Sequence, residues 1–426
     1  MLAIVVALIV SDGIARRLTN FDSASAASER ALFLSHLPGH ARNLTDDDDP
    51  AEPVHRAYGA GYELHPFFGY TFRHDTSGAN NRGFFASGRT YPYVKAPDEF
   101  VIGIFGGSVA MQVASAPGPL VERLRPALLE KGYDRIVVLP FSVGGWREPQ
   151  TFAALVAYLP TIDMAVNLDG FNEVVQLTDD VLMAYPASYP WSEVYGTLAD
   201  EASSPDEVIR RAKLVLANRI AASLTTAADA PVLRSSALAH LAWRSAASAH
   251  SRITARLRRD RHHTLDKTYR GLDPLPAGGV GAKRDAYLAE LGQTWRLSDV
   301  VCRSSGRPFF QFLQPNQYVR GAKPLSEEEQ TAFTAKEGWF DVVTPAYERL
   351  EITTSRLRAA GIESHSLARV FADVPDTLYA DACCHLNERG VALLAAAMGD
   401  RIAASRSFAA IPRRPSQAAS FANAAR

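Results

Sequence analysis

Five short apolar runs recur along the chain from residue 97 onward, with helical stretches between them. Runs that are apolar throughout, rather than alternately apolar and polar, are typical of parallel strands buried on both faces. Helices between such strands cover the two faces of the sheet. We therefore predict a three-layer α/β/α sandwich with a five-stranded parallel sheet, whose central strand ends at Gly106. The predicted strands are "EFVIGIFGG" (99–107), "RIVVLPFS" (135–142), "DMAVNLDGFNEV" (163–174), "RPFFQFLQP" (307–315) and "ESHSLARVF" (363–371).

The helices predicted between these strands cover residues 117–133, 149–159, about 326–360 and about 387–405. A segment of different character, about 185–300, is rich in Ala, Arg and Leu and shows helical periodicity, so we predict a helical insertion outside the sheet. Above the strand ends, such an insertion suits a lid or a substrate-binding cap. Its basic stretch "SRITARLRRDRHH" (251–263) is either a contact for an anionic glycan or lipid headgroup or a solvated helix end.

The N-terminus carries nine uninterrupted apolar residues, "LAIVVALIV" (2–10). This run is too short to span a bilayer, which takes about 20 residues, and it lacks the basic region that precedes a signal peptide. It is either the start of a buried element or, as we favour, the remnant of a longer signal or anchor segment over residues 1–18. Residues 19–60 are small, polar and acidic, with "DDDDP" at 46–50, and we predict a linker there. Residues 407–426 are expected to form a flexible tail.

Composition limits the partners and the covalent links of the chain. A formal net charge of −1 gives no global basic field, so nucleic acid is not expected as a partner. The three cysteines, Cys302, Cys383 and Cys384, lack the spacing of metal ligands. In an exported protein Cys302 bridges to one of the adjacent pair; otherwise all three are packed as small hydrophobic thiols.

Polar groups and glycines follow three successive predicted strands. Ser108 comes directly after Gly106 and Gly107, so it is either a nucleophile at a strand-to-helix turn or a helix N-cap. Gly145 follows the second strand and offers a backbone N–H, and Asn172 follows the third and offers an amide. Because the carboxyl ends of parallel strands share one edge, these donors are expected to meet there, where they suit a developing oxyanion.

The stretch "YADACCHLNERG" (379–390), just before the last predicted helix, holds a carboxylate and an imidazole. Asp381 lies four residues before His385, close enough to orient the imidazole that would activate a serine. Ser, Asp and His occur in the chain order of other α/β hydrolytic folds.

These four blocks, "GGSVA", "GG" (144–145), "GFNE" and "DACCHLN", together resemble those of the SGNH hydrolase superfamily, the GDSL-type esterases and lipases, over about residues 61–406. Upstream, "HPFFGYTFR" (65–73) and "NNRGFF" (80–85) resemble the lead-in of its membrane-anchored bacterial members. The resemblance implies a flavodoxin-like sheet, acyl-ester chemistry, and no metal or cofactor. It makes Ser108 the nucleophile, His385 the general base, and the N–H groups of Ser108 and Gly145 with the Asn172 amide the oxyanion hole.

Two positions depart from the family pattern. The Asp of the last block usually stands three residues before the His, where this chain has Ala382, and Glu173 replaces the last Asp of the third block. The expected function is an extracytoplasmic serine ester hydrolase, held near the membrane by its N-terminus, that acts on an O-acyl ester of a glycan or lipid. An O-acyltransferase for a cell-envelope polysaccharide and a non-catalytic carbohydrate-binding relative are the alternatives.

Overall fold

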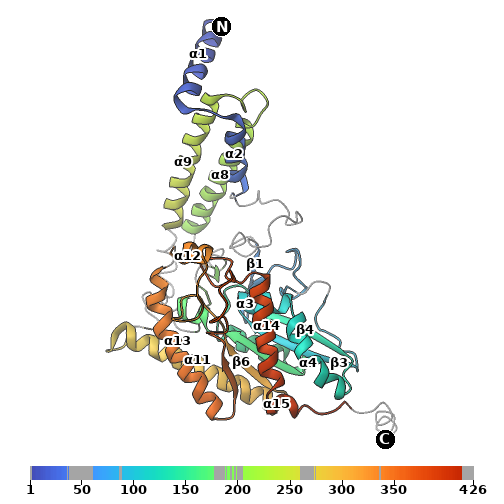
Figure 1. The fold of residues 1–426 in the computed structure, drawn as a ribbon. Helices are drawn as coiled ribbons and strands as arrows, with labels where there is room; N and C mark the ends of the chain where they lie inside the picture. The colour runs from blue at the N-terminus through green and yellow to red at the C-terminus, as the bar shows by residue number, and fades with distance from the viewer. Residues whose placement is uncertain are drawn as a thin grey trace. The chain divides into compact units, whose positions relative to one another are not determined.

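The computed structural model describes residues 2–35, 37, 61–85, 89–176, 188, 190–191, 194–195, 198, 205–259, 273, 275–334 and 337–414. The chain divides into two compact units (Figure 1). One, the helical unit, comprises Met1–Ala60 and Gly196–Tyr269, and the other, the α/β unit, comprises Gly61–Tyr195 and Arg270–Arg426.

The α/β unit is built on a five-stranded parallel sheet, which confirms the predicted fold class. Its strands stand in the order β4-β3-β5-β6-β7, which numbered along the chain is the 2-1-3-4-5 order of flavodoxin-like sheets. The strand that ends at Gly106 is therefore second from the edge, and the predicted central position belongs to β5, because the chain adds β4 outside β3 before crossing back. The strands are β3 (Glu99–Gly106), β4 (Arg135–Ser142), β5 (Met164–Asp169), β6 (Phe309–Leu313) and β7 (Glu363–Ser366).

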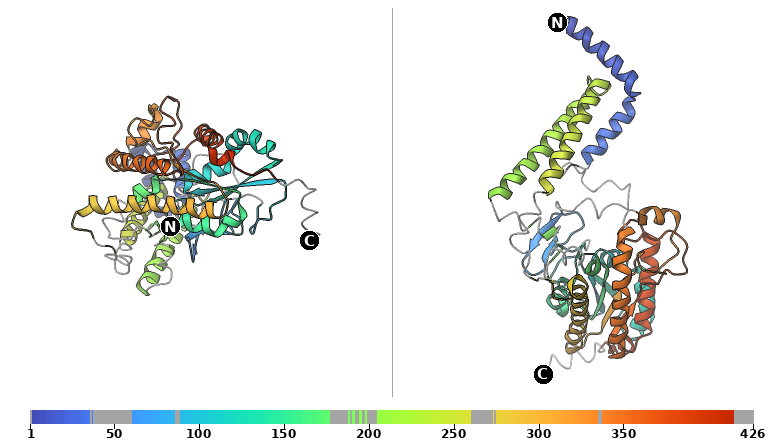
Figure 2. Two further views of the ribbon diagram at one scale, coloured as in Figure 1. Left: turned by 90° about the horizontal axis from the view of Figure 1, so that it is seen from below. Right: turned by 90° about the vertical axis from the view of Figure 1, so that its left-hand side faces the viewer.

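Two sets of helices cover the sheet. Right-handed crossovers place α3 (Ser108–Ser115), α4 (Gly118–Glu130) and α14 (Glu388–Ala403) on one face and α5 (Gln150–Tyr158), α11 (Gly279–Ser304) and α13 (Phe340–Ala359) on the other. Figure 2 shows α4 and α14 on the opposite side of the sheet from α5 and α11. All eight residues of β3 are buried, as a strand covered on both faces requires.

Shorter elements complete the α/β unit. The predicted helix over about 326–360 is in fact α12 (Glu327–Thr334), the 3-10 turn η3 (Glu337–Trp339) and α13, with Gly338, a poor helix former, in the interruption. The predicted tail at 407–426 begins with α15 (Arg406–Ala409), which buries Phe408, so it packs on the unit through residue 414. The remaining elements are the antiparallel pair β1 (Tyr62–His65) and β2 (Gly69–Phe72), and η1 (Leu159–Thr161).

The helical unit holds α1 (Leu2–Thr19), α2 (Ser23–Ser35), α8 (Pro205–Ala228) and α9 (Ala237–Arg259). Part of the predicted 19–60 linker is thus helical: α2 buries Ala26 and Arg30, and the Arg30 guanidinium donates to Asp229 at 2.5 Å. The alanine content of this segment explains the difference, because alanine favours helices and packs closely. Residues 38–60 of the predicted linker lie outside the described residues.

The predicted insertion at about 185–300 does not form one body. Helices α8 and α9 belong to the helical unit, whereas α11 belongs to the α/β unit and buries Leu288, Leu291 and Trp295 in its core. These residues recur at helical spacing on one face. Because α11 stands between β5 and β6 in the chain, it is the crossover helix that joins these strands.

The apolar N-terminal run lies in helix α1, not in the sheet. Asp12 of α1 accepts hydrogen bonds from Ser236 Oγ at 2.6 Å and from the Leu238 N–H at 3.0 Å, which fixes α1 against α9. In the described part of the chain, no helix has the length and apolar character needed to cross a bilayer.

All three cysteines are free thiols, so the predicted bridge from Cys302 is wrong. The Cys302 carbonyl accepts from the Arg307 N–H, which places Cys302 just before β6, at the amino end of the sheet. Cys383 and Cys384 instead lie beside the residues that follow the strands' carboxyl ends. Helix α11 runs antiparallel to β6, so its C-terminal end, which carries Cys302, lies where β6 begins. Cys302 is therefore at the opposite edge of the sheet from Cys383 and Cys384.

Candidate active site

The Gly-Gly pair before Ser108 is required by the close approach of neighbouring elements. Gly106 has φ +141°, and a Cβ there would lie 2.1 Å from the Leu168 carbonyl oxygen of β5. A Cβ on Gly107 would lie 2.4 Å from Nδ2 of Asn172. Any side chain at either position would therefore displace the turn that starts α3. These glycines bring Ser108, the first residue of α3, to the carboxyl edge of the sheet next to Asn172.

Ser108 and His385 are in hydrogen-bond contact although 277 positions separate them in the chain. The distance from Ser108 Oγ to His385 Nε2 is 2.8 Å, and the two residues are only 5% and 6% exposed. An imidazole nitrogen at this distance can remove the hydroxyl proton as the oxygen attacks an electrophile.

Asp381 completes the chain of contacts in spite of its unusual spacing. Its Oδ2 lies 2.5 Å from His385 Nδ1. Its Oδ1 accepts from the backbone N–H groups of Cys383 (2.8 Å), Cys384 (3.1 Å) and His385 (3.3 Å). The carboxylate therefore organises the turn that connects Asp381 to His385. The spacing of four residues between Asp381 and His385 is long enough to form this turn. A proton on Nδ1 toward Asp381 leaves Nε2 as the acceptor that faces Ser108.

The predicted oxyanion donors lie in the turns around Ser108. The Ser108 N–H is in the first turn of α3, where backbone N–H groups lack intrahelical partners and the helix dipole is positive. Asn172 Nδ2 donates to the Trp146 carbonyl at 2.8 Å, and this bond uses one of its two hydrogens. Gly145 has φ +76°, and its N–H donates no hydrogen bond to any residue that the structure describes. The turns after β3, β4 and β5 thus supply donors at one edge of the sheet.

Gln112, which the sequence analysis did not single out, ties the serine helix to the histidine turn. Its Nε2 donates to the Leu386 carbonyl at 2.8 Å, and its Oε1 accepts from the Leu386 N–H at 3.1 Å. Gln112 lies one helical turn after Ser108 and Leu386 directly follows His385, so this pairing helps to set the distance between the serine and the imidazole. The available sequence signal was that Gln112 follows Ser108 by four residues, which places the two side chains on the same face of a helix.

Asp381 and His385 lie at the tip of a short hairpin. The Ala380 N–H donates to the His385 carbonyl at 2.8 Å, and the Asn387 N–H donates to the Leu378 carbonyl at 2.8 Å. The Asn387 side chain caps α14 and also donates to the Thr377 carbonyl at 2.7 Å. The hairpin is therefore fastened to the start of α14.

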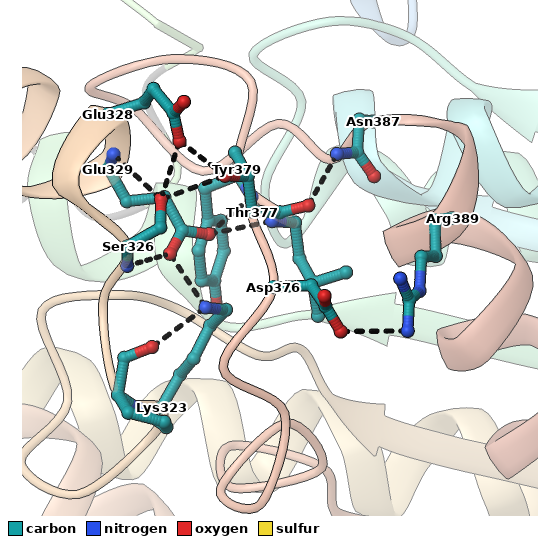
Figure 3. A network of polar contacts seen from close by, with 11 residues as sticks. Lys323, Ser326, Glu328, Glu329, Asp376, Thr377, Tyr379, Asn387 and Arg389 are labelled. Atoms are coloured by element: carbon teal, nitrogen blue, oxygen red, sulfur yellow. Dashed lines mark hydrogen bonds and ion pairs between the residues drawn. The ribbon is translucent and has the colours of Figure 1, made fainter.

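A buried ion pair holds the other leg of this hairpin (Figure 3). The Glu329 carboxylate accepts from the N–H groups of Leu378 (2.7 Å) and Tyr379 (2.9 Å) and from Lys323 Nζ (2.6 Å). Burial acts to raise the pKa of Glu329, but these donors outweigh it and the pKa is lowered. The charged carboxylate is thus the stable form, and it anchors the backbone that leads to Asp381.

Three buried carboxyl groups, Glu148, Asp169 and Glu173, lie behind the oxyanion turns. Burial, with the Glu173 charge adding to it, raises the pKa of Glu148 to about 8 and that of Asp169 well above its usual range. Glu173 accepts from the N–H groups of Glu148 at 3.1 Å and Gly170 at 2.8 Å. Because Gly145 and Asn172 belong to these two turns, Glu173 connects the segments that carry the donors.

No cluster of three or more His, Cys, Asp or Glu side chains among the described residues is arranged to hold a metal ion. In comparisons with known proteins, no family model matches the chain, and no curated protein is significantly similar to it.

Proposed function

We propose that this protein is a serine ester hydrolase of the SGNH type, with an O-acyl ester of a glycan or lipid as its substrate. The observation that carries the proposal is the continuous contact from Ser108 Oγ to His385 Nε2, at 2.8 Å, and from His385 Nδ1 to Asp381 Oδ2, at 2.5 Å. The supporting observation is the set of donors in the turns after β3, β4 and β5. A nucleophile, a base and an orienting carboxylate beside an oxyanion site form the constellation of acyl-transfer enzymes.

In the first half of the reaction, Ser108 Oγ attacks the ester carbonyl carbon while His385 Nε2 takes the hydroxyl proton. The carbonyl oxygen becomes an oxyanion that accepts from the Ser108 N–H, the Gly145 N–H and the Asn172 amide. Asp381 stabilises the imidazolium that forms. As the tetrahedral intermediate collapses, the ester C–O bond breaks and His385 returns the proton to the leaving alkoxide, which departs as an alcohol.

In the second half, a water molecule replaces the alcohol. His385 takes a proton from the water as its oxygen attacks the acyl carbon, and the bond to Ser108 breaks as the serine regains a proton. The products are a carboxylic acid and free enzyme, and no cofactor is consumed. With a sugar hydroxyl in place of water, the same steps transfer the acyl group.

We further propose that the enzyme acts in the cell envelope and associates with the membrane through its N-terminus. This part of the proposal is supported by the apolar residues of α1 and by the resemblance of residues 65–73 and 80–85 to the lead-in of membrane-anchored bacterial members of the SGNH superfamily.

The test is turnover of short p-nitrophenyl esters and acetylated glycans, with and without a sugar acceptor. Wild-type protein should release acid and alcohol, and Ser108→Ala should not. Ser115→Ala, an exposed serine at the end of the same helix, is the matched control and should keep full activity. Acylation of the acceptor in place of acid release would assign an acyltransferase. Glycan binding without turnover would assign a binding protein and refute the proposal.

A further inference from the structure

The segment from Ile209 to Arg259, which forms most of α8 and all of α9, carries a charge unlike that of the whole chain. It contains ten Lys and Arg residues and one acidic residue, Asp229, so its formal charge is +9, against −1 for the whole protein. Asp229 is itself paired with Arg30 at 2.5 Å. This segment therefore concentrates positive charge, although the helical unit as a whole, with 17 basic and 15 acidic residues, has a formal charge of only +2.

Helix α8 also exposes large apolar side chains in a row. Ile209, Leu216, Ile220 and Leu224 are 52%, 57%, 51% and 46% exposed. Their spacings of seven, four and four residues place them along one face of the helix, which we call the α8 stripe.

The opposite face of α8 packs with small residues. Ala221, Ala222, Thr225 and Ala228 are buried, and Thr225 Oγ1 accepts from Trp243 Nε1 of α9 at 2.9 Å. The helix therefore buries its small side chains and exposes its large ones, which reverses the usual pattern of a soluble amphipathic helix. An exposed apolar row of this length marks a surface that meets another apolar phase.

Basic residues accompany the α8 stripe. Lys213 is exposed and lies between Ile209 and Leu216 on the same face of α8. Arg219 is also exposed and lies beside this face. No acidic residue occurs from Ile209 to Leu224. A lysine within an apolar row suits an interface, where its stem lies along hydrocarbon and its ammonium reaches headgroups.

Helix α1 of the same unit shows a second exposed row. Val10, Ile14 and Leu18 recur every four residues and are 55%, 54% and 80% exposed. The apolar exterior of the helical unit is thus not confined to one helix.

We propose that the α8 stripe, with Lys213 and Arg219, lies in the headgroup region of an anionic membrane. Apolar side chains on one face and lysine and arginine beside them are the features of helices that bind in the plane of such interfaces. An anionic polysaccharide or a nucleic acid would satisfy the charge but would leave the apolar row in water. This assignment does not depend on the catalytic proposal.

A local reporter tests the assignment in the full chain, where α1 is also present. We would attach an environment-sensitive fluorophore to Ile220→Cys in a Cys383→Ser background, since Cys302 and Cys384 are buried. The matched control carries the label at Ile352→Cys, which is equally exposed, at 52%, on α13 of the α/β unit. Vesicles of phosphatidylcholine, with and without phosphatidylglycerol, provide the two surfaces.

The emission of the label at residue 220 should shift to the blue with phosphatidylglycerol vesicles and return as salt is added, while the label at 352 should not respond. Lys213→Gln and Arg219→Gln should each weaken this binding about fivefold, equivalent to about 1 kcal/mol. Arg356→Gln on α13 is the charge control and should have no effect. No shift at residue 220, an equal shift at 352, or an equal response to neutral vesicles would overturn the proposal, as would binding of an anionic polymer without binding of vesicles.

Discussion

Replacement of Asp381 by asparagine separates the two tasks of this side chain. Oδ1 of Asp381 accepts three backbone N–H groups, and the amide oxygen of an asparagine can accept the same three. The turn should therefore keep its structure. On the other side, an NH₂ group would replace Oδ2, which lies 2.5 Å from His385 Nδ1.

This NH₂ group changes the tautomer of His385. Two N–H donors cannot face each other at that distance, so the imidazole would place its proton on Nε2 and use Nδ1 as an acceptor. A protonated Nε2 cannot take the Ser108 proton. The corresponding change in a serine protease lowers kcat by about 10⁴, and we expect a loss of roughly 10³ to 10⁴ here, or about 4 to 5.5 kcal/mol.

The assay compares kcat for ester hydrolysis with the midpoint of thermal unfolding. Asp381→Asn should lose activity while its unfolding midpoint stays close to that of the wild type, whereas Asp381→Ala should lower both. Asp376→Asn is the matched control, because Asp376 lies nearby and pairs with Arg389 at 2.8 Å on the surface. Near-wild-type turnover by Asp381→Asn would refute the orienting role and leave a Ser-His dyad.

Three further changes probe the site. Asn172→Ala should lower kcat by about 10² to 10³ with the fold intact, and an unchanged kcat would remove the amide from the oxyanion hole. Gln112→Met keeps the side-chain volume but removes both bonds to Leu386; kcat should fall with KM unchanged, and stability by about 1 to 3 kcal/mol in urea unfolding. Burial raises the pKa of Glu148 from 4.5 to about 8, so wild-type stability should fall as pH rises through that window. Glu148→Gln should flatten this dependence, and an unaltered pH profile would contradict the raised pKa.

Most of the sheet was predictable because β3, β4, β5 and β6 are largely apolar, whereas β7, with the sequence Glu-Ser-His-Ser, lacks this signal. Strands covered on both faces are mostly apolar, and Gly106 and Gly107 mark a turn where side chains cannot fit. The positions of Ser108, His385 and Asn172 follow from that topology. The order of strands was harder to predict, because the sequence does not specify on which side of β3 the strand β4 pairs.

Contacts between distant segments explain the remaining differences. The role of Gln112 was not predictable because it depends on Leu386, 274 positions away. The sequence does not reveal the boundary between α9 and α11, where the helical unit ends and the α/β unit resumes. All three helices, α8, α9 and α11, show helical periodicity, and they differ in what covers their apolar faces. The small residues of α2 give no amphipathic pattern, so its sequence does not predict a helix.

The most direct test of the catalytic proposal is to trap a covalent adduct on the nucleophile, phosphonyl or acyl, and locate it. The protein would be incubated with a fluorophosphonate or a slowly hydrolysed ester, and the adduct located by peptide mass spectrometry. We predict a single adduct on Ser108, formed much more slowly in His385→Ala and absent in Ser108→Ala. An adduct on another serine, or full ester turnover by Ser108→Ala, would contradict the proposed mechanism.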